Sequence, residues 1–76
     1  MTEPRKPQLL DIVAVLDSAG DDGVEVGDVG TVVELLPPDG VEVEFVDRNG
    51  RTRNVSTFPV NKVLVLNRER TPVSEP

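Results

Sequence analysis

Hydrophobic and polar residues alternate along much of the chain with the two-residue period of a β-strand. The clearest stretch is VEVEFVD, residues 41–47, in which valine and phenylalanine alternate with glutamate. Alternation of this kind places successive side chains on opposite faces of a strand. We therefore expect Val41, Val43 and Phe45 in the core and the glutamates in solvent. No stretch has the i, i+3, i+4 spacing of an amphipathic helix.

Further valine-rich segments lie between glycine, proline and aspartate clusters, about ten residues apart, as in small all-β barrels. The first should turn Val13 and Val15 inward. The second is apolar at both parities, as expected of a strand that bends. Pro59 should interrupt the fourth strand, and residues 60–62 are long enough for one 3₁₀ turn. The four further strands are expected at residues 11–16, 29–36, 51–56 and 63–66.

Together these elements predict an all-β fold, a small five-stranded SH3-like barrel with one 3₁₀ turn before the last strand. Closing the sheet hides edges that an open five-stranded sheet would expose. The barrel is expected to cover residues 9–66. Residues 1–8 and 67–76, with several prolines and mixed charge, are expected to be flexible tails.

Glycine and proline mark the connections between these strands. Residues 37–40, PPDG, predict a turn in which Gly40 takes a positive φ. Asn49 and Gly50 form the strongest short-range signal for a hairpin. Gly27 and Gly30 contain half of a dinucleotide fingerprint, without a third glycine or a following helix. We interpret Gly27 as permitting a turn and Gly30 as allowing close approach of a neighbouring backbone or ring.

The amino-acid composition excludes several kinds of functional site. The chain has no cysteine and no histidine, so it lacks a disulfide framework, a thiolate zinc site and the commonest general base. No constellation of catalytic residues is present, and we expect neither enzymatic activity nor a cofactor. The longest apolar run is residues 12–16, far short of the ~20 residues of a membrane span. We expect a cytoplasmic protein that does not bind membranes.

The net charge of the chain indicates which class of partner it binds. Fourteen acidic and eight basic residues give a formal net charge of −6, which repels a phosphate backbone. We expect another protein, and not nucleic acid, as the partner. A KOW-like RNA- or ribosome-associated factor is the alternative, because KOW elements also pair a glycine with a following strand. Such elements are rich in lysine and arginine, whereas Glu25, Asp28 and Glu34 flank the glycines here.

The stretch DSAGDDGVEVGD, residues 17–28, predicts a long acidic loop. Asp21, Asp22 and Glu25 are candidate partner-binding residues in it. Val24 and Val26 are expected to form a short arm folded back on the barrel. The spacing of the carboxylates does not match a calcium-binding loop, and weak cation binding is a third hypothesis.

Three arginines surround the hairpin and form a small basic spot. Their structural interpretation is charge balance against Glu42 and Glu44 across the hairpin. Their functional interpretation is docking of an acidic partner. These residues are Arg48, Arg51 and Arg53.

Phe45 and Phe58 are the only aromatic residues in the sequence. Without tyrosine or tryptophan the polyproline groove of true SH3 domains is not expected. Phe58 either caps the barrel or anchors a partner. These features favour a non-enzymatic protein-interaction module, such as a regulator, an accessory subunit or an antitoxin-like inhibitor. It is expected to be a monomer or a weak homodimer.

The segments DIVAVLD, GDVGTVVELL, VEVEFVDRNGRT and VLVL resemble the bacterial family catalogued as domain of unknown function 4926, over residues 9–66. More distantly, the layout is similar to the SH3-like peripheral (reaction centre IV) subunit of photosystem I. That subunit also has a VGTVV element before an alternating strand that ends in phenylalanine. The resemblance implies a fold, and it implies no catalytic residues.

Overall fold

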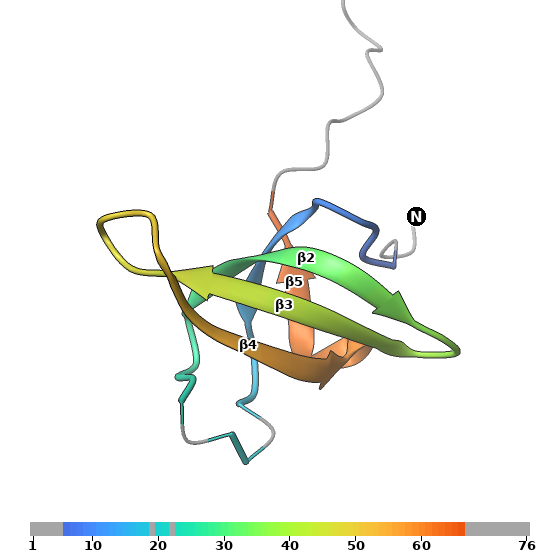
Figure 1. Ribbon diagram of the computed structural model, residues 1–76. Coiled ribbons are helices and arrows are strands. Elements are labelled where there is room, and N and C mark those ends of the chain that lie inside the picture. The colour runs from blue at the N-terminus through green and yellow to red at the C-terminus, as the bar shows by residue number, and fades with distance from the viewer. Residues whose placement is uncertain (1–5, 19, 22, 67–76) are drawn as a thin grey trace, which may run out of the picture.

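A computed structural model describes residues 6–18, 20–21 and 23–66. All strand pairs are antiparallel, and the strands form one sheet in the order β4-β3-β2-β1-β5. The sheet curls so that β1 and β5 lie behind β2, β3 and β4 (Figure 1). The elements are β1 (Ile12–Val15), β2 (Val29–Leu36), β3 (Gly40–Val46), β4 (Thr52–Pro59), the 3₁₀ helix η1 (Val60–Lys62) and β5 (Val63–Val65). The predicted five-stranded SH3-like barrel is confirmed.

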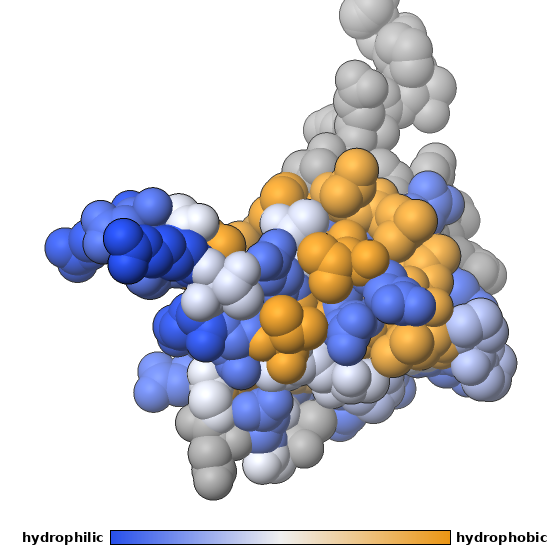
Figure 2. All heavy atoms as spheres, viewed as in Figure 1, coloured by the Kyte–Doolittle hydropathy of each residue, from blue (hydrophilic) through white to orange (hydrophobic). Residues whose placement is uncertain are grey.

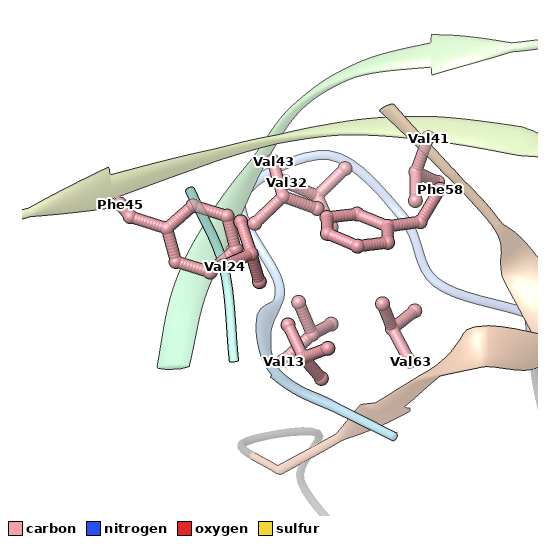
Figure 3. Close-up of a cluster of buried hydrophobic side chains, with 9 residues drawn as sticks. Val13, Val24, Val32, Val41, Val43, Phe45, Phe58 and Val63 are labelled. Carbon is pink, nitrogen blue, oxygen red and sulfur yellow. The ribbon is translucent and has the colours of Figure 1, made fainter. Parts of the chain in front are cut away.

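The core is built from valine and phenylalanine, as the alternation predicts. Val41, Val43 and Phe45 of β3 are buried, and so are Val13 and Val15 of β1. The nine buried hydrophobic residues form one cluster, of which eight are labelled in Figure 3. The cluster consists of Val13, Val15, Val24, Val32, Val41, Val43, Phe45, Phe58 and Val63.

Two phenylalanine rings occupy the middle of this core. Phe45 and Phe58 meet edge to face, with ring centroids 6.2 Å apart and an interplanar angle of 81°. Such pairs contribute ~0.5–1.5 kcal/mol beyond their area burial. Phe58 has no exposed surface, so it completes the core. Of the two roles expected for Phe58, the structural one is confirmed, and partner binding through its side chain is wrong.

A β-bulge bends β2. Val32 pairs with Val43, whereas Glu34 pairs with Glu42, so Val33 is an extra residue without an opposite partner. An extra residue shifts the alternation by one and increases the local bend. This confirms the expected bend and explains why Val32 is buried while Val33 is exposed.

Gly30 lies where β2 and β3 come closest. A Cβ atom there would lie 2.7 Å from the Glu44 carbonyl oxygen, 2.7 Å from Val43 Cγ1 and 2.8 Å from Phe45 Cδ1. The predicted close approach of a backbone and a ring is confirmed. Gly27 has a φ of 95° and Gly50 a φ of 84°, as their turn positions require.

Two details differ from the sequence prediction. Strand β4 continues through Phe58 to Pro59 instead of stopping at residue 56. Proline is tolerated there because β4 is an edge strand and Pro59 is its last residue. Gly40 has no positive φ; it pairs with Leu36 and begins β3.

Residues 1–5 and 67–76, most of the two predicted tails, lie outside the described residues. The remainder of the N-terminal segment contacts the barrel: Pro7 is buried, and Lys6 lies 3.7 Å from an Asp39 carboxylate oxygen. Gln8 donates a backbone hydrogen bond to the Asp11 carboxylate.

Candidate binding surfaces

The acidic loop between β1 and β2, residues 17–28, folds back on the barrel. The Gly27 amide donates to the Val15 carbonyl and the Val15 amide donates to the Asp28 carbonyl, both at 2.8 Å. Val24 is buried in the core, whereas Val26 is exposed. The expected valine arm is therefore half right: one valine anchors the loop and the other does not, and neither is in a strand.

This loop is held against the edge strand β4. The Asp21 carboxylate accepts the Gly23 amide at 2.8 Å and also the Ser56 hydroxyl. Ser56, which is buried, accepts a hydrogen bond from Asn54 Nδ2 at 2.9 Å. These hydrogen bonds lower the pKa of Asp21 below its usual 3.8, and the bond from Ser56 has the largest effect. Burial opposes them with a smaller effect. The loop is thus fixed to β4 by side-chain hydrogen bonds.

A second contact joins the same loop to β4. The Asp28 carboxylate accepts the Glu25 amide at 3.0 Å and the Arg53 guanidinium at 3.2 Å. The Glu25 amide is the main cause of the lowered pKa of Asp28; burial opposes it and Arg53 adds to it. The guanidinium carbon of Arg53 also lies 5.7 Å from the Phe45 ring centroid, within cation–π range. Arg53 therefore acts within the fold.

The structure separates the residues that the sequence grouped as partner-binding. Asp21 and Arg53 have partners within the chain, and Asp22 lies outside the described residues. Glu25, Arg48 and Arg51 have exposed side chains, and their role in binding stays a prediction. No ion pair between described residues joins the three arginines to Glu42 or Glu44, so the expected charge balance across the hairpin is absent.

The hairpin tip is stabilised by aspartate. Asp47 accepts the amides of Asn49 at 2.8 Å and Arg51 at 3.0 Å through the same carboxylate oxygen. At the other end of the barrel, Lys62 of η1 pairs with Asp17 at 2.9 Å. Within the described part of the chain, no three acidic side chains come together as potential metal ligands.

A different surface stands out on the outer side of β2, β3 and β4, which we call the outer face. We define it by eight outward side chains of these strands: Thr31, Val33, Glu34, Glu42, Glu44, Val46, Val55 and Thr57. The valines have exposed fractions of 39% for Val33, 53% for Val46 and 46% for Val55. Figure 2 shows apolar patches over these strands with hydrophilic atoms between them.

Large apolar side chains are exposed on several parts of the barrel, and three of them, Val33, Val46 and Val55, lie on the outer face. Eleven large hydrophobic side chains of the described chain are exposed, whereas nine are buried in the core. Single exposed apolar residues are ordinary, but contiguous apolar surface rimmed by polar groups marks interaction sites. The core is already filled by its nine buried residues, so the exposed valines of the outer face do not pack inside the barrel.

Three glutamates lie among the outer-face valines. Glu34 of β2 stands directly opposite Glu42 of β3, and Glu44 follows on the same face of β3. Glu42 and Glu44 are half-buried. Glu44 accepts a hydrogen bond from Thr52, and none of the three forms an ion pair with a described residue. Like charges opposite one another destabilise a sheet.

Sequence reasoning placed Glu42 and Glu44 in solvent but did not recognise the outer face. Alternation along β3 was the available signal. The pairing of Glu34 with Glu42 depends on the bulge at Val33, whose position alternation does not specify.

These features define a small SH3-like barrel with an amphipathic outer face. The family model described as Domain of unknown function (DUF4926) matches residues 9–65, and the chain belongs to this family. No curated protein matches the chain, and no solved structure matches it either. The likeness to the photosystem I subunit thus stays an expectation about layout. No helix among the described residues is long and apolar enough to cross a membrane.

Proposed function

We propose that this domain is a non-enzymatic protein-interaction module that binds another protein through its outer face. The observation that supports this proposal is the half-exposed state of Val33, Val46 and Val55 on a sheet whose interior is already filled. Covering apolar surface contributes roughly 25 cal/mol per Å². A protein partner that covers these valines would remove them from water, which no part of the barrel does.

Charge supports a protein partner over nucleic acid. The net charge of −6 and the three glutamates of the outer face repel a phosphate backbone. Proteins, in contrast, offer apolar and basic side chains together. A role as a regulator, accessory subunit or antitoxin-like inhibitor fits a module of this size.

The chemistry of the remaining acidic residues supports a role outside catalysis. The chain has no histidine or cysteine. The carboxylates of Asp21 and Asp28 accept hydrogen bonds that hold the acidic loop on β4. Their lowered pKa values lie further from neutral pH than that of an ordinary aspartate, which makes these carboxylates poor proton donors and weak bases.

The proposal is tested by photo-crosslinking in cells that make the protein. A photoreactive phenylalanine analogue is placed at Val55 in one version and at Glu25, on the acidic loop, in a control version. We expect one discrete adduct from position 55 and a weaker or absent adduct from position 25. The Val46→Ser change, made in the position-55 version, should reduce that adduct. Equal labelling from both positions, or none from position 55, would contradict the proposed surface.

A further inference from the structure

We infer that the outer face receives an amphipathic helix whose lysine or arginine side chains meet Glu34, Glu42 and Glu44. This inference rests on the proposed function, because it names the kind of partner that the outer face takes. The valines supply the apolar contact, and the glutamates determine the charge of the segment that covers them.

Charge complementarity selects a basic partner. Glu34 and Glu42 stand opposite each other, and neither forms an ion pair with a described residue. Glu42 is half-buried, which weakens the solvent screening of this repulsion. A basic side chain placed between the two carboxylates would turn the repulsion into attraction. A second copy of the same face would instead bring three more carboxylates against these, so the charges disfavour a homodimer through this surface.

Backbone hydrogen bonding selects a helix over an extended strand. The amides and carbonyls of β3 are used in its ladders with β2 and β4, so the outer face offers only side chains. An extended segment lying on this face would leave its own amides and carbonyls without partners from the sheet. A helix satisfies its backbone internally and packs readily on the face of a sheet.

The spacing of the charges also fits a helix. Glu42 and Glu44 are two positions apart on β3, which corresponds to ~6.7 Å along a strand. Helical residues four apart lie on one face and are separated by ~6 Å along the axis. Basic residues at i and i+4 therefore match the two glutamates when the helix runs along β3.

The inference is tested by titration calorimetry of the full chain with three synthetic peptides. The first is an 18-residue amphipathic helix with leucine on one side and lysines at i and i+4 flanking it. The second has the same composition in scrambled order, and the third has glutamate in place of lysine. We expect binding of the first peptide alone, weakening as salt is raised.

Variants of the chain then locate the site. Glu34→Gln with Glu42→Gln should weaken binding of the basic helix roughly three- to tenfold, the loss expected for two exposed ion pairs. Asp17→Asn with Asp39→Asn changes the net charge by the same amount outside the outer face and should leave the affinity within about twofold. The glutamine substitutions remove repulsion, so loss of folding is not expected to accompany them.

The outcomes separate this inference from the proposed function. If the glutamate peptide binds as well as the lysine peptide, and Val55→Ser weakens both, the outer face is a binding surface but the basic partner is wrong. If the scrambled peptide binds equally well, the helix is wrong. Absence of binding by the basic helix overturns the inference, while the crosslinking experiment still decides the proposed function.

Discussion

Replacing Gly30 with alanine should destabilise the protein strongly, because the added methyl has no space. Its carbon would lie 2.7 Å from the Glu44 carbonyl oxygen and 2.7 Å from Val43 Cγ1. The Glu44 oxygen belongs to a central strand paired on both sides, so it cannot move without disturbing two ladders. Overpacking costs ~1–3 kcal/mol, and this backbone contact places the change in the upper half, about 2–3 kcal/mol.

The assay is thermal and urea unfolding followed by far-ultraviolet circular dichroism. In a domain of this length each kcal/mol shifts Tm by ~4–8 °C, so Gly30→Ala should lower Tm by roughly 8–24 °C. The control is Gly27→Asn. Gly27 has a φ of 95° with open space around its Cβ position, and asparagine tolerates the left-handed region. The control should cost about 1 kcal/mol, from backbone strain alone, and thus less than Gly30→Ala although it adds a larger side chain.

Comparing Gly30→Ala with Gly27→Asn shows whether the loss of stability comes from close packing at Gly30 or from replacing any glycine. If Gly30→Ala is as stable as the parent, or less destabilised than Gly27→Asn, then β2 and β3 do not approach closely enough at Gly30 to exclude a methyl group. The bulge and the position of Phe45 would then be in doubt as well.

Three further changes test other parts of the structure. Glu42→Lys should replace the repulsion from Glu34 by attraction and raise stability by ~0.5–1 kcal/mol, seen as a Tm higher by roughly 2–8 °C; a lower Tm would contradict the pairing. Phe58→Ala should cost ~3–5 kcal/mol in urea unfolding, and a loss below about 1 kcal/mol would show that Phe58 is not in the core. The folded pKa values of Asp21 and Asp28 lie below the unfolded 3.8, so their contribution is present above that pH and lost as the pH falls through the folded pKa. Asp28→Asn should therefore flatten the fall in Tm below about pH 4, and an unchanged slope would show that Asp28 does not contribute.

The fold was accessible from the sequence because side-chain alternation along a strand reports which face is buried. Val41, Val43 and Phe45 follow this rule without exception. Pairing register is not encoded in that alternation. The bulge at Val33, which places Glu34 opposite Glu42, results from contacts between strands.

The candidate site was less accessible, because charge in a sequence does not reveal which partner a charge has in space. Arg53 was grouped with Arg48 and Arg51 by proximity in the chain, yet it pairs with Asp28, which lies 25 residues earlier. The acidic loop was similarly expected to offer its carboxylates to a partner, whereas Asp21 and Val24 attach it to the barrel. The outer face emerges only from the three-dimensional arrangement, in which the outward side chains of β2, β3 and β4 come together.

The most direct test of the account is to map the backbone amide shifts of the ¹⁵N-labelled full chain as the basic helical peptide is added. If the outer face binds the helix, the shifts concentrate at Glu42, Glu44 and Val55, while Glu25 and Arg48 change little. Shifts concentrated on the acidic loop and the hairpin tip, with β3 unaffected, would contradict the claim that the outer face is the binding surface.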